Sequence, residues 1–370
     1  MPSVNTPETA GGPDGMSRFV SDRRRVLLSV AVGIFLTTGV VLLLGKASGF
    51  AKFVDRLGEA NVGWLIAGVV AQVLSILAYV LAFRTITVGK HGKPLPPGPT
   101  SQIVLAGLGA TRLLAAAGAG GLAVNYWGLR RAGIGAREAV ARVVMLNTLL
   151  YTIFGCIGMT TAAVLWVRGD APAALAISWI AVIGTCLIAA GFVSSDRRAP
   201  RLSREPHVDT DAGRLVTTIR KGFAVAVVAL TRTRAILLAP RRHIPVIAGS
   251  LGYWVADIAC LAIGLRAFDV DVAPGVVVLA YATGYVANIL PLPTGGVGGI
   301  DAAMTYALNL LGVPLQDALA GVVAYRFVGF WLPTIPGVWA LIRLPRLGRT
   351  LEATREGQCI VSEAPWISGE

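Results

Sequence analysis

The feature that most constrains this chain is a series of apolar runs, each long enough to cross a lipid bilayer. The first two occupy residues 26–45 and 62–83. A helix of about 20 apolar residues spans the roughly 30 Å hydrocarbon core of a membrane. Hydrophobic residues make up 55% of the 370 residues and charged residues only 14%, whereas soluble domains carry about a quarter charged residues. These figures exclude an ordinary soluble enzyme and a disordered chain, and they predict an all-α polytopic membrane protein.

Further apolar runs bring the expected number of transmembrane helices to about seven or eight. Two segments, residues 101–122 and 301–311, are broken by glycine or are too short for simple spans. We expect these segments to be broken or re-entrant. If one of them re-enters and the other crosses, every loop assignment below is consistent. The other complete runs are residues 139–167, 173–193, 246–265, 275–290 and 319–342.

Basic residues set the expected orientation of the chain. There are 33 Lys and Arg against 20 Asp and Glu, which gives a net charge of +13. The basic residues lie between the apolar runs rather than on one amphipathic face, so the positive-inside bias explains them better than nucleic-acid binding does. The short loops at 168–171 and 267–273 should then face outward. The cytoplasmic parts should be a disordered N-terminus at 1–25, the loops at 84–100 and 194–245, and the tail at 346–370.

The loop at 194–245 contains an apolar stretch at 223–230 that is too short to cross a bilayer. It predicts an amphipathic helix lying on the cytoplasmic surface. The basic residues of this loop are suited to anionic headgroups, although the positive-inside bias accounts for them without any such role.

Cysteine and histidine spacing gives no sign of a metal site. Cys156, Cys186 and Cys260 lie inside apolar runs, and the sequence contains no CxxC pair. The three histidines are scattered in polar loops. The sequence also lacks a nucleophile elbow, a P-loop and an HExxH motif. We therefore expect no metal, no cofactor and no catalytic residue.

An internal repeat relates two parts of the chain at a constant offset of 179 in the numbering. GIGAREAVA at 133–141 aligns with GVPLQDALA at 312–320, and the same offset pairs Gly120 with Gly299. In each copy a glycine-rich segment precedes the start of a long helix. A chance match is the alternative in a chain this rich in Ala, Gly and Val. The predicted transmembrane domain covers residues 26–345, with repeat one at about 101–167 and repeat two at about 280–342. In transporters, such repeats place the substrate site at their interface.

The segment 288–302 breaks a helix with two prolines and four glycines. Non-helical backbone at membrane depth is tolerated only where it is buried in protein or lines a wet cavity. The free N–H groups at the start of the following short helix would bind an anion, and a lipid phosphate is the obvious one. The alternative is a hinge whose glycines allow close helix packing. The candidate headgroup ligands here are Asn288, Gly295 and Gly296.

Two charged residues fall inside apolar runs. Asp257 lies near the middle of the run 246–265, and Arg326 lies several residues inside the last run. An ionisable group at the bilayer centre costs roughly 2.5–3.5 kcal/mol, so it indicates a functional site with a partner. We expect Arg326 to be the partner of Asp257. A purely structural buried ion pair is the alternative.

Two more charged residues lie in the broken segments. Arg112 is a second candidate for a phosphate contact, since arginine binds phosphate bidentately; the alternative is a side chain that extends to the interface. Asp301 should lie at the start of the short helix, where a carboxylate caps the helix N-terminus. Capping is the favoured interpretation of Asp301, with a coupling or ion-pair role as the alternative.

With PLPTGGVGGIDA at 291–302 and FWLPTIPG at 330–337, the second repeat resembles the lysylphosphatidylglycerol synthase transmembrane, or flippase-like, domain family. The resemblance covers about residues 26–345 and is most specific in repeat two. The family usually has Glu where this chain has Asp301, which keeps the carboxylate but shortens its reach. The residues that carry the resemblance are PLPTGGVGGIDA at 291–302, Gly312-Val313, Ala318, Tyr325-Arg326 and FWLPTIPG at 330–337, with NYW at 125–127 and LRRAG at 129–133 in repeat one.

The resemblance implies a multi-pass protein of the bacterial inner membrane. In bifunctional members this domain is linked to lipid translocation, and a separate C-terminal cytosolic domain transfers lysine from charged tRNA. In this chain only the short tail 346–370 follows the predicted transmembrane domain. We therefore expect the translocator half without the aminoacyl-transferase domain.

The expected function is to translocate or bind a phospholipid or a polyprenyl-phosphate-linked lipid, with membrane lipids as partners. Since no ATP-binding motif is present in the sequence, passive or ion-coupled exchange is expected. The alternatives are a non-catalytic subunit that presents lipid to a separately encoded soluble transferase, and an envelope scaffold. The expected headgroup ligands are Arg112, Asn288, Gly295, Gly296 and Arg326, with Asp257 and Asp301 as coupling or ion-pair residues.

Overall fold

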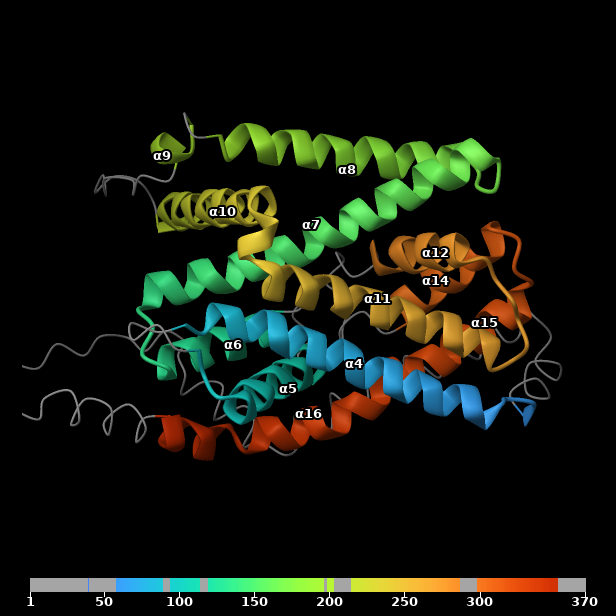
Figure 1. Ribbon diagram of the computed structural model, residues 1–370, viewed down its shortest axis with the longest axis horizontal. Helices are drawn as coiled ribbons and strands as arrows, with labels where there is room; N and C mark the ends of the chain where they lie inside the picture. Colours follow the sequence, from blue (N-terminus) through green and yellow to red (C-terminus); the bar gives the residue numbers. More distant parts are fainter. Residues whose placement is uncertain are drawn as a thin grey trace, which may run out of the picture.

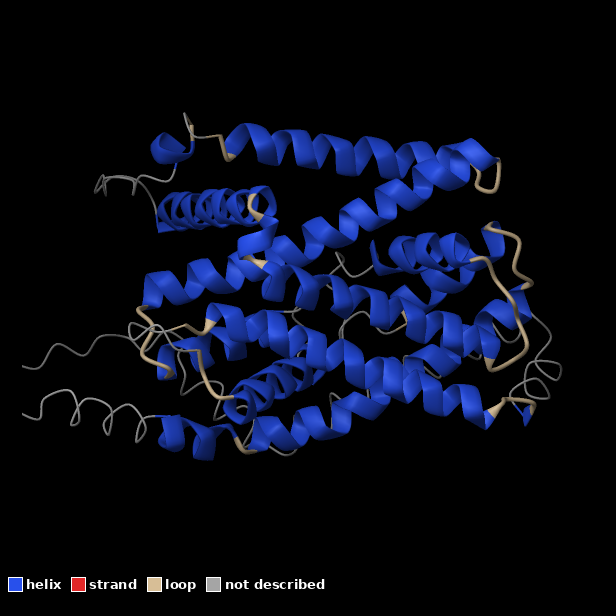
Figure 2. Cartoon of the chain, viewed as in Figure 1, coloured by secondary structure: helices blue, strands red, loops and turns tan. Residues whose placement is uncertain are grey.

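The computed structural model describes residues 39, 58–88, 94–113, 119–195, 198–202, 214–286 and 298–351. Every regular element in these ranges is a helix (Figures 1 and 2). The expected N-terminal segment 1–25 and nearly all of the expected first span lie outside them. Five described helices are long and apolar enough to cross a membrane, which confirms an all-α polytopic fold. They are α4 (Val62–Ile86), α7 (Ala136–Arg168), α8 (Ala173–Val193), α11 (Ile244–Arg266) and the continuous stretch Leu315–Ile342.

The surfaces of these helices are apolar where no protein covers them. On α4, Val70, Val73 and Leu77 are each at least half exposed. On α8, Ile188 is 76% exposed. A water-soluble protein rarely leaves contiguous apolar patches of this kind, whereas lipid tails solvate them without cost. The exposed surface of these helices is therefore suited to contact with the hydrocarbon chains of a bilayer.

Two helical hairpins lie between the long helices. The first is α5 (Pro97–Leu113) with α6 (Ala119–Arg131), and the second is α12 (Pro274–Val286) with α14 (Gly299–Leu310). At about 1.5 Å per residue, α14 is only about 18 Å long, too short to cross the hydrocarbon core, and the described parts of α6 and α12 are each about 20 Å long. α12 is described as far as Val286, so the last residues of the span expected at 275–290 lie outside the described residues.

The first hairpin begins and ends on the same side of the molecule. Where α4 ends, Arg84 Nε donates to Leu95 O just before α5, at 3.1 Å. Near the start of α7, Arg142 Nη1 donates to Ile86 O at 2.9 Å. The end of α4, the start of α5 and the start of α7 therefore meet at one end of the bundle, which is rich in arginine. We call it the basic end.

The second hairpin enters from the other side, which we call the opposite end. There Asn61 N, before α4, donates to Ala267 O after α11 at 2.7 Å. A small apolar cluster joins the same region to the start of α15 through Phe268 and Leu319. Both broken segments thus re-enter, from opposite ends, in place of the one re-entry and one crossing considered from the sequence. The loops at 168–171 and 267–273 lie together at the opposite end. Gly275, just after the second loop, lies against Leu165, just before the first, and this contact brings the two loops together.

The helices α4 and α11 run antiparallel through the centre of the bundle (Figure 1). Glycines allow them to pack closely. A Cβ on Gly249 would lie 2.6 Å from Ala78 O, and a Cβ on Gly68 would lie 3.5 Å from Ile263 Cγ2. Small residues at contact positions are the usual means of bringing membrane helices together. This contact joins the two halves of the chain.

The repeat offset also relates the helix boundaries. By this same offset, the end of α6 corresponds to the end of α14, and the start of α7 to the start of α15 (Leu315–Arg326). Gly133 and Gly312 both have positive φ, 85° and 94°. Arg130 Nη1 donates to Ile134 O at 2.9 Å, and its counterpart Asn309 Nδ2 donates to Val313 O at 3.0 Å. Because α4 and α11 are antiparallel and the hairpins enter from opposite ends, the two halves have inverted topology, as in many secondary transporters.

An additional helix, α10 (Arg214–Leu238), lies at the basic end beside the short elements α9 (Ala199–Leu202) and η1 (Pro240–Arg242). It extends well beyond the apolar stretch predicted at 223–230. In Figure 1 it is seen at a steep angle to α7, against which it packs. Ala229, Thr233 and Ile236 are buried along one face, whereas Arg220 on the opposite face is exposed. This two-sided pattern is typical of an interfacial helix.

Candidate functional site

Three charged side chains are buried at the junction of the two halves. Asp257 on α11, Asp301 in the first turn of α14 and Arg326 at the end of α15 are each only 6–7% exposed. Asp301 lies at the tip of the second hairpin, and Asp257 lies at the middle of its helix. Both positions lie far from either end of the bundle. Charges at such depth are expensive, and in membrane proteins they mark substrate or ion pathways.

Arg326 pairs with Asp301. Its Nε and Nη2 atoms both contact Asp301 Oδ1. The other carboxylate oxygen, Oδ2, accepts the backbone N–H of Gly298 at 3.0 Å, at the N-terminus of α14. Asp301 is therefore both the helix cap predicted for it and the partner of Arg326. The prediction that Arg326 pairs with Asp257 is wrong. The N-terminus of α14 places Asp301 in contact with the Arg326 guanidinium instead.

Asp257 is held by two tyrosine hydroxyls in place of a cation. Tyr281 on α12 and Tyr325 on α15 both donate to Asp257 Oδ2, the latter at 3.0 Å. Among the described residues, Asp257 takes part in no ion pair. Phenol donors stabilise an anion less than a guanidinium does. Asp257 is thus a buried carboxyl whose neighbours accommodate either protonation state, since tyrosine hydroxyls both donate and accept.

An aromatic wall encloses Asp257. The Trp254 ring stacks on Phe154 of α7 with centroids 4.3 Å apart, and the Tyr281 ring stacks on Tyr285 at 5.7 Å. Trp254 Nε1 donates to Leu150 O at 2.9 Å, which fixes the indole against α7. These rings come from helices of both halves. They line the surroundings of the carboxyl, and among them Tyr281 directs its hydroxyl to it.

Arg112, at the tip of the first hairpin, reaches across to the last transmembrane helix. That helix is interrupted by a π-helical segment, η3 (Phe327–Trp331), which leads into α16 (Leu332–Ile342). Pro333 has no N–H to donate to Gly329 O four residues earlier, so this carbonyl needs another donor. Arg112 Nη2 donates to Gly329 O at 2.9 Å, and Nη1 donates to Phe330 O at 2.7 Å. The alternative in which the Arg112 side chain extends to the interface is therefore wrong. The side chain instead stabilises the interruption of the last helix at η3.

A small cavity of about 120 Å³ lies between the halves near this site. Asn125 on α6 is buried beside it, and its Nδ2 donates to Tyr79 OH on α4 at 3.1 Å. Its Oδ1 has no hydrogen-bond partner in the described part of the chain. A buried amide oxygen without a partner indicates a position for a water molecule or for a polar group of a ligand.

The remaining candidate ligands, Asn288, Gly295 and Gly296, lie outside the described residues. Neither Tyr281 nor Tyr325 was predicted as a site residue from the sequence, although Tyr325 is among the residues that carry the family resemblance. A tyrosine in an apolar run resembles any other core aromatic, and only the packing of α11, α12 and α15 brings both hydroxyls to Asp257. We call Asp257, Tyr281, Asp301, Tyr325, Arg326 and Arg112 the central cluster.

The fold and the central cluster define a class: polytopic membrane proteins made of two inverted halves, each with a re-entrant hairpin. The chain belongs to the family described as the lysylphosphatidylglycerol synthase TM region, whose model matches residues 26–337. It is also similar to a UPF0104 membrane protein of Methanothermobacter thermautotrophicus (strain Delta H). The two sequences are 20% identical over 332 residues, which cover 84% of this chain and 93% of that protein.

Proposed function

We propose that this protein translocates a phospholipid or a polyprenyl-phosphate-linked lipid between the two leaflets. The observation that carries the proposal is the set of buried charges at the interface of two inverted halves. Asp257 has no cationic partner among the described residues, and the Arg326–Asp301 pair lies close by. A scaffold has no need for such groups at this depth, whereas a polar headgroup that crosses the hydrocarbon core needs groups of this kind to replace water.

Arg326 is the proposed headgroup ligand. A phosphate offers several oxygens to a guanidinium and competes with a carboxylate for the same N–H groups. When the headgroup binds Arg326, Asp301 keeps the N–H of Gly298 as a donor, so its charge is not left without any partner. The acyl chains stay in the surrounding lipid throughout. Without substrate, Arg326 is paired with Asp301. When substrate binds, the Arg326 guanidinium donates to the phosphate in place of Asp301.

Asp257 is the proposed coupling residue. Its carboxyl lies between the hydroxyls of Tyr281 and Tyr325, which connect it to α12 and α15. The sequence contains no ATP-binding motif, and we propose that proton uptake and release at Asp257 accompany movement of the headgroup. Intramembrane carboxyls serve as proton relays in many transporters.

The proposed membrane is the cytoplasmic membrane, with the basic end in the cytoplasm. Arg130, Arg142 and Arg346 lie at this end, whereas Asp170 and Asp271 lie at the opposite end. This asymmetry follows the positive-inside rule. Both termini of the chain would then be cytoplasmic.

The test is reconstitution of the purified chain in vesicles that contain a trace of fluorescent phosphatidylglycerol. A membrane-impermeant reductant bleaches only the outer-leaflet label in protein-free vesicles. We expect bleaching to continue into the inner-leaflet pool when the wild-type chain is present. Bleaching that stops at the outer leaflet with folded wild-type chain would contradict the proposal and would favour a subunit that presents lipid to a transferase.

A further inference from the structure

A cavity with several basic side chains in its lining lies at the basic end, away from the central cluster. It has a volume of about 740 Å³ and lies between α4, α7, α10 and the start of α11. Binding sites for small ligands usually measure about 300–1,000 Å³. Its lining combines two kinds of side chain. The basic ones are Arg84, Arg142, Arg232, Arg242 and His243, and the apolar ones include Leu81, Ile86, Met145, Ile236 and Val246.

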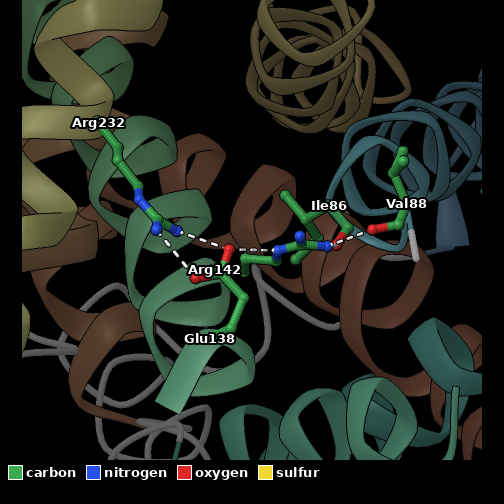
Figure 3. Close-up of polar contacts among 5 residues, drawn as sticks. All are labelled: Ile86, Val88, Glu138, Arg142 and Arg232. Carbon is green, nitrogen blue, oxygen red and sulfur yellow. Dashed lines mark hydrogen bonds and ion pairs between the residues drawn. The ribbon is translucent and has the colours of Figure 1, made fainter. Parts of the chain in front are cut away.

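Two of these arginines share a single carboxylate (Figure 3). Arg142 Nε donates to Glu138 Oε1 at 2.8 Å, and Arg232 on α10 forms two bonds of 2.9 Å to the same carboxylate. Arg142 Nη1 also donates to Val88 O at 2.6 Å. Glu138 therefore holds two guanidinium groups beside the cavity and connects α7 to α10.

The other two arginines have few partners. Arg84 uses its Nε to bond Leu95 O, and its two terminal nitrogens have no acceptor among the described residues. Arg242 forms no hydrogen bond or ion pair through its side chain in the same part of the chain. Glu138 is the acidic group bonded to the lining, so four arginines against one carboxylate leave an excess of positive charge around the cavity.

The apolar part of the cavity's lining reaches the outer surface of the bundle. Leu81 of its lining is 43% exposed on a helix whose outer face is apolar, and Ile236 and Met145 form apolar walls beside the arginines. A soluble anion has no use for apolar walls, whereas a phospholipid has both an anionic headgroup and acyl chains. The position at the end of the bundle is the depth at which headgroups lie in a bilayer.

We propose that this cavity binds an anionic phospholipid from the leaflet at the basic end, and that Glu138 is the intramolecular competitor of its phosphate. In the absence of lipid, Glu138 neutralises Arg142 and Arg232. A bound phosphate joins Arg84 and Arg242 and takes one of these two guanidiniums from Glu138. The site concerns binding alone, so it stands whether or not the protein translocates lipid.

The test measures binding of fluorescent phosphatidylglycerol to the full chain in detergent micelles, with zwitterionic phosphatidylcholine, which has no net charge, as the comparison. We expect the Arg84→Gln/Arg242→Gln double variant to weaken phosphatidylglycerol binding by about thirtyfold, the effect of two lost basic residues near a headgroup. Glu138→Gln should strengthen binding severalfold, because the competitor loses its charge. Arg343→Gln is the matched control: this arginine is also at the basic end but stacks on Trp339, 3.7 Å from the ring centroid, and does not line the cavity.

The direction of the Glu138→Gln effect separates a binding site from a structural ion pair. Unchanged or weaker binding by a folded Glu138→Gln chain would overturn the role of the competitor. An equal loss with Arg343→Gln would show that only the general charge of the basic end matters, and would overturn the site. Displacement of the lipid by inorganic phosphate at equal concentration would overturn the assignment to a lipid.

Discussion

Asp301 and Asp257 show how position decides what a buried carboxylate does. Both are almost fully buried, yet Asp301 has a guanidinium and a backbone N–H as partners, whereas Asp257 has only two phenols. A paired charge contributes mainly to holding the structure, and removing one partner of such a pair is costly. A carboxyl without a cation is free to change its protonation state. We therefore expect variants of the two residues to fail in different ways.

Arg326→Ala should destabilise the fold by about 3–5 kcal/mol, because it leaves the Asp301 carboxylate buried without its cation. Thermal unfolding in detergent measures this loss. The Asp301→Asn/Arg326→Gln double variant is the control, since it removes both charges together, and it should recover most of the lost stability. A single variant as stable as the wild type would show that the pair is not buried as described.

Asp257→Asn should leave stability nearly unchanged, because the amide oxygen still accepts from Tyr281 and Tyr325. Translocation should lose its pH dependence and slow by at least about a hundredfold, the lower end of what a positioned proton-transfer group contributes. The measurement is the bleaching rate at a series of pH values for both proteins. The Asn variant should give a flat profile; a profile that still follows the wild type would exclude Asp257 as the coupling residue.

At the scale of elements, the two halves differ most in their last helix. In the first half, α7 continues unbroken from Ala136 to Arg168, whereas in the second half the corresponding helix changes at η3 to a π-helix. Pro333 and Pro336 remove two N–H donors there, and Arg112 supplies donors from the other half. Movement of α16 relative to α15 would have to break these bonds. Arg112 therefore holds the bend at η3 in place.

Close packing of α5 on α16 depends on Gly109. A Cβ at this position would lie 2.6 Å from the backbone carbon of Gly337, so Gly109→Ala should destabilise the fold by about 1–3 kcal/mol. Gly184→Ala on α8 is the matched control, because no atom lies within 4 Å of its Cβ position. Thermal unfolding of both variants in the same detergent checks the difference. Equal unfolding temperatures would contradict the described contact.

The sequence predicted the long helices well and the hairpins only in part. Length and hydropathy suffice for α4, α7, α8 and α11, since each apolar run is close to the thickness of a bilayer. The α12 segment is apolar as well, but whether it crosses the membrane or re-enters depends on how it packs against α14. Hydropathy does not predict that packing. Hydropathy does reveal the buried charges, because they interrupt apolar runs. It does not reveal that Arg326 pairs with Asp301. Pairing is decided by tertiary packing across the hairpin tip.

At the scale of the whole molecule, the inverted halves predict opposite exposure of equivalent turns. The starts of α7 and α15 are equivalent positions of the repeat but lie at opposite ends of the bundle. Single cysteines at Ala136 and Gln316, in a background in which native cysteines are replaced by alanine, should react with a membrane-impermeant maleimide from opposite sides. We expect Gln316→Cys to react in intact cells and Ala136→Cys only after the membrane is opened. Labelling of both from the same side would contradict the inverted arrangement.

The most direct test of the central claim asks whether the buried charges are needed for translocation or only for folding. The Asp301→Asn/Arg326→Gln double variant separates these roles, because it removes the guanidinium without leaving an unpaired charge. The measurement is the rate of inner-leaflet bleaching of fluorescent phosphatidylglycerol in vesicles that contain equal amounts of folded wild-type or double-variant chain. If Arg326 binds the headgroup, the double variant should bleach no faster than protein-free vesicles. A wild-type rate from the double variant would show that the pair is structural and that lipid does not move by way of the central cluster.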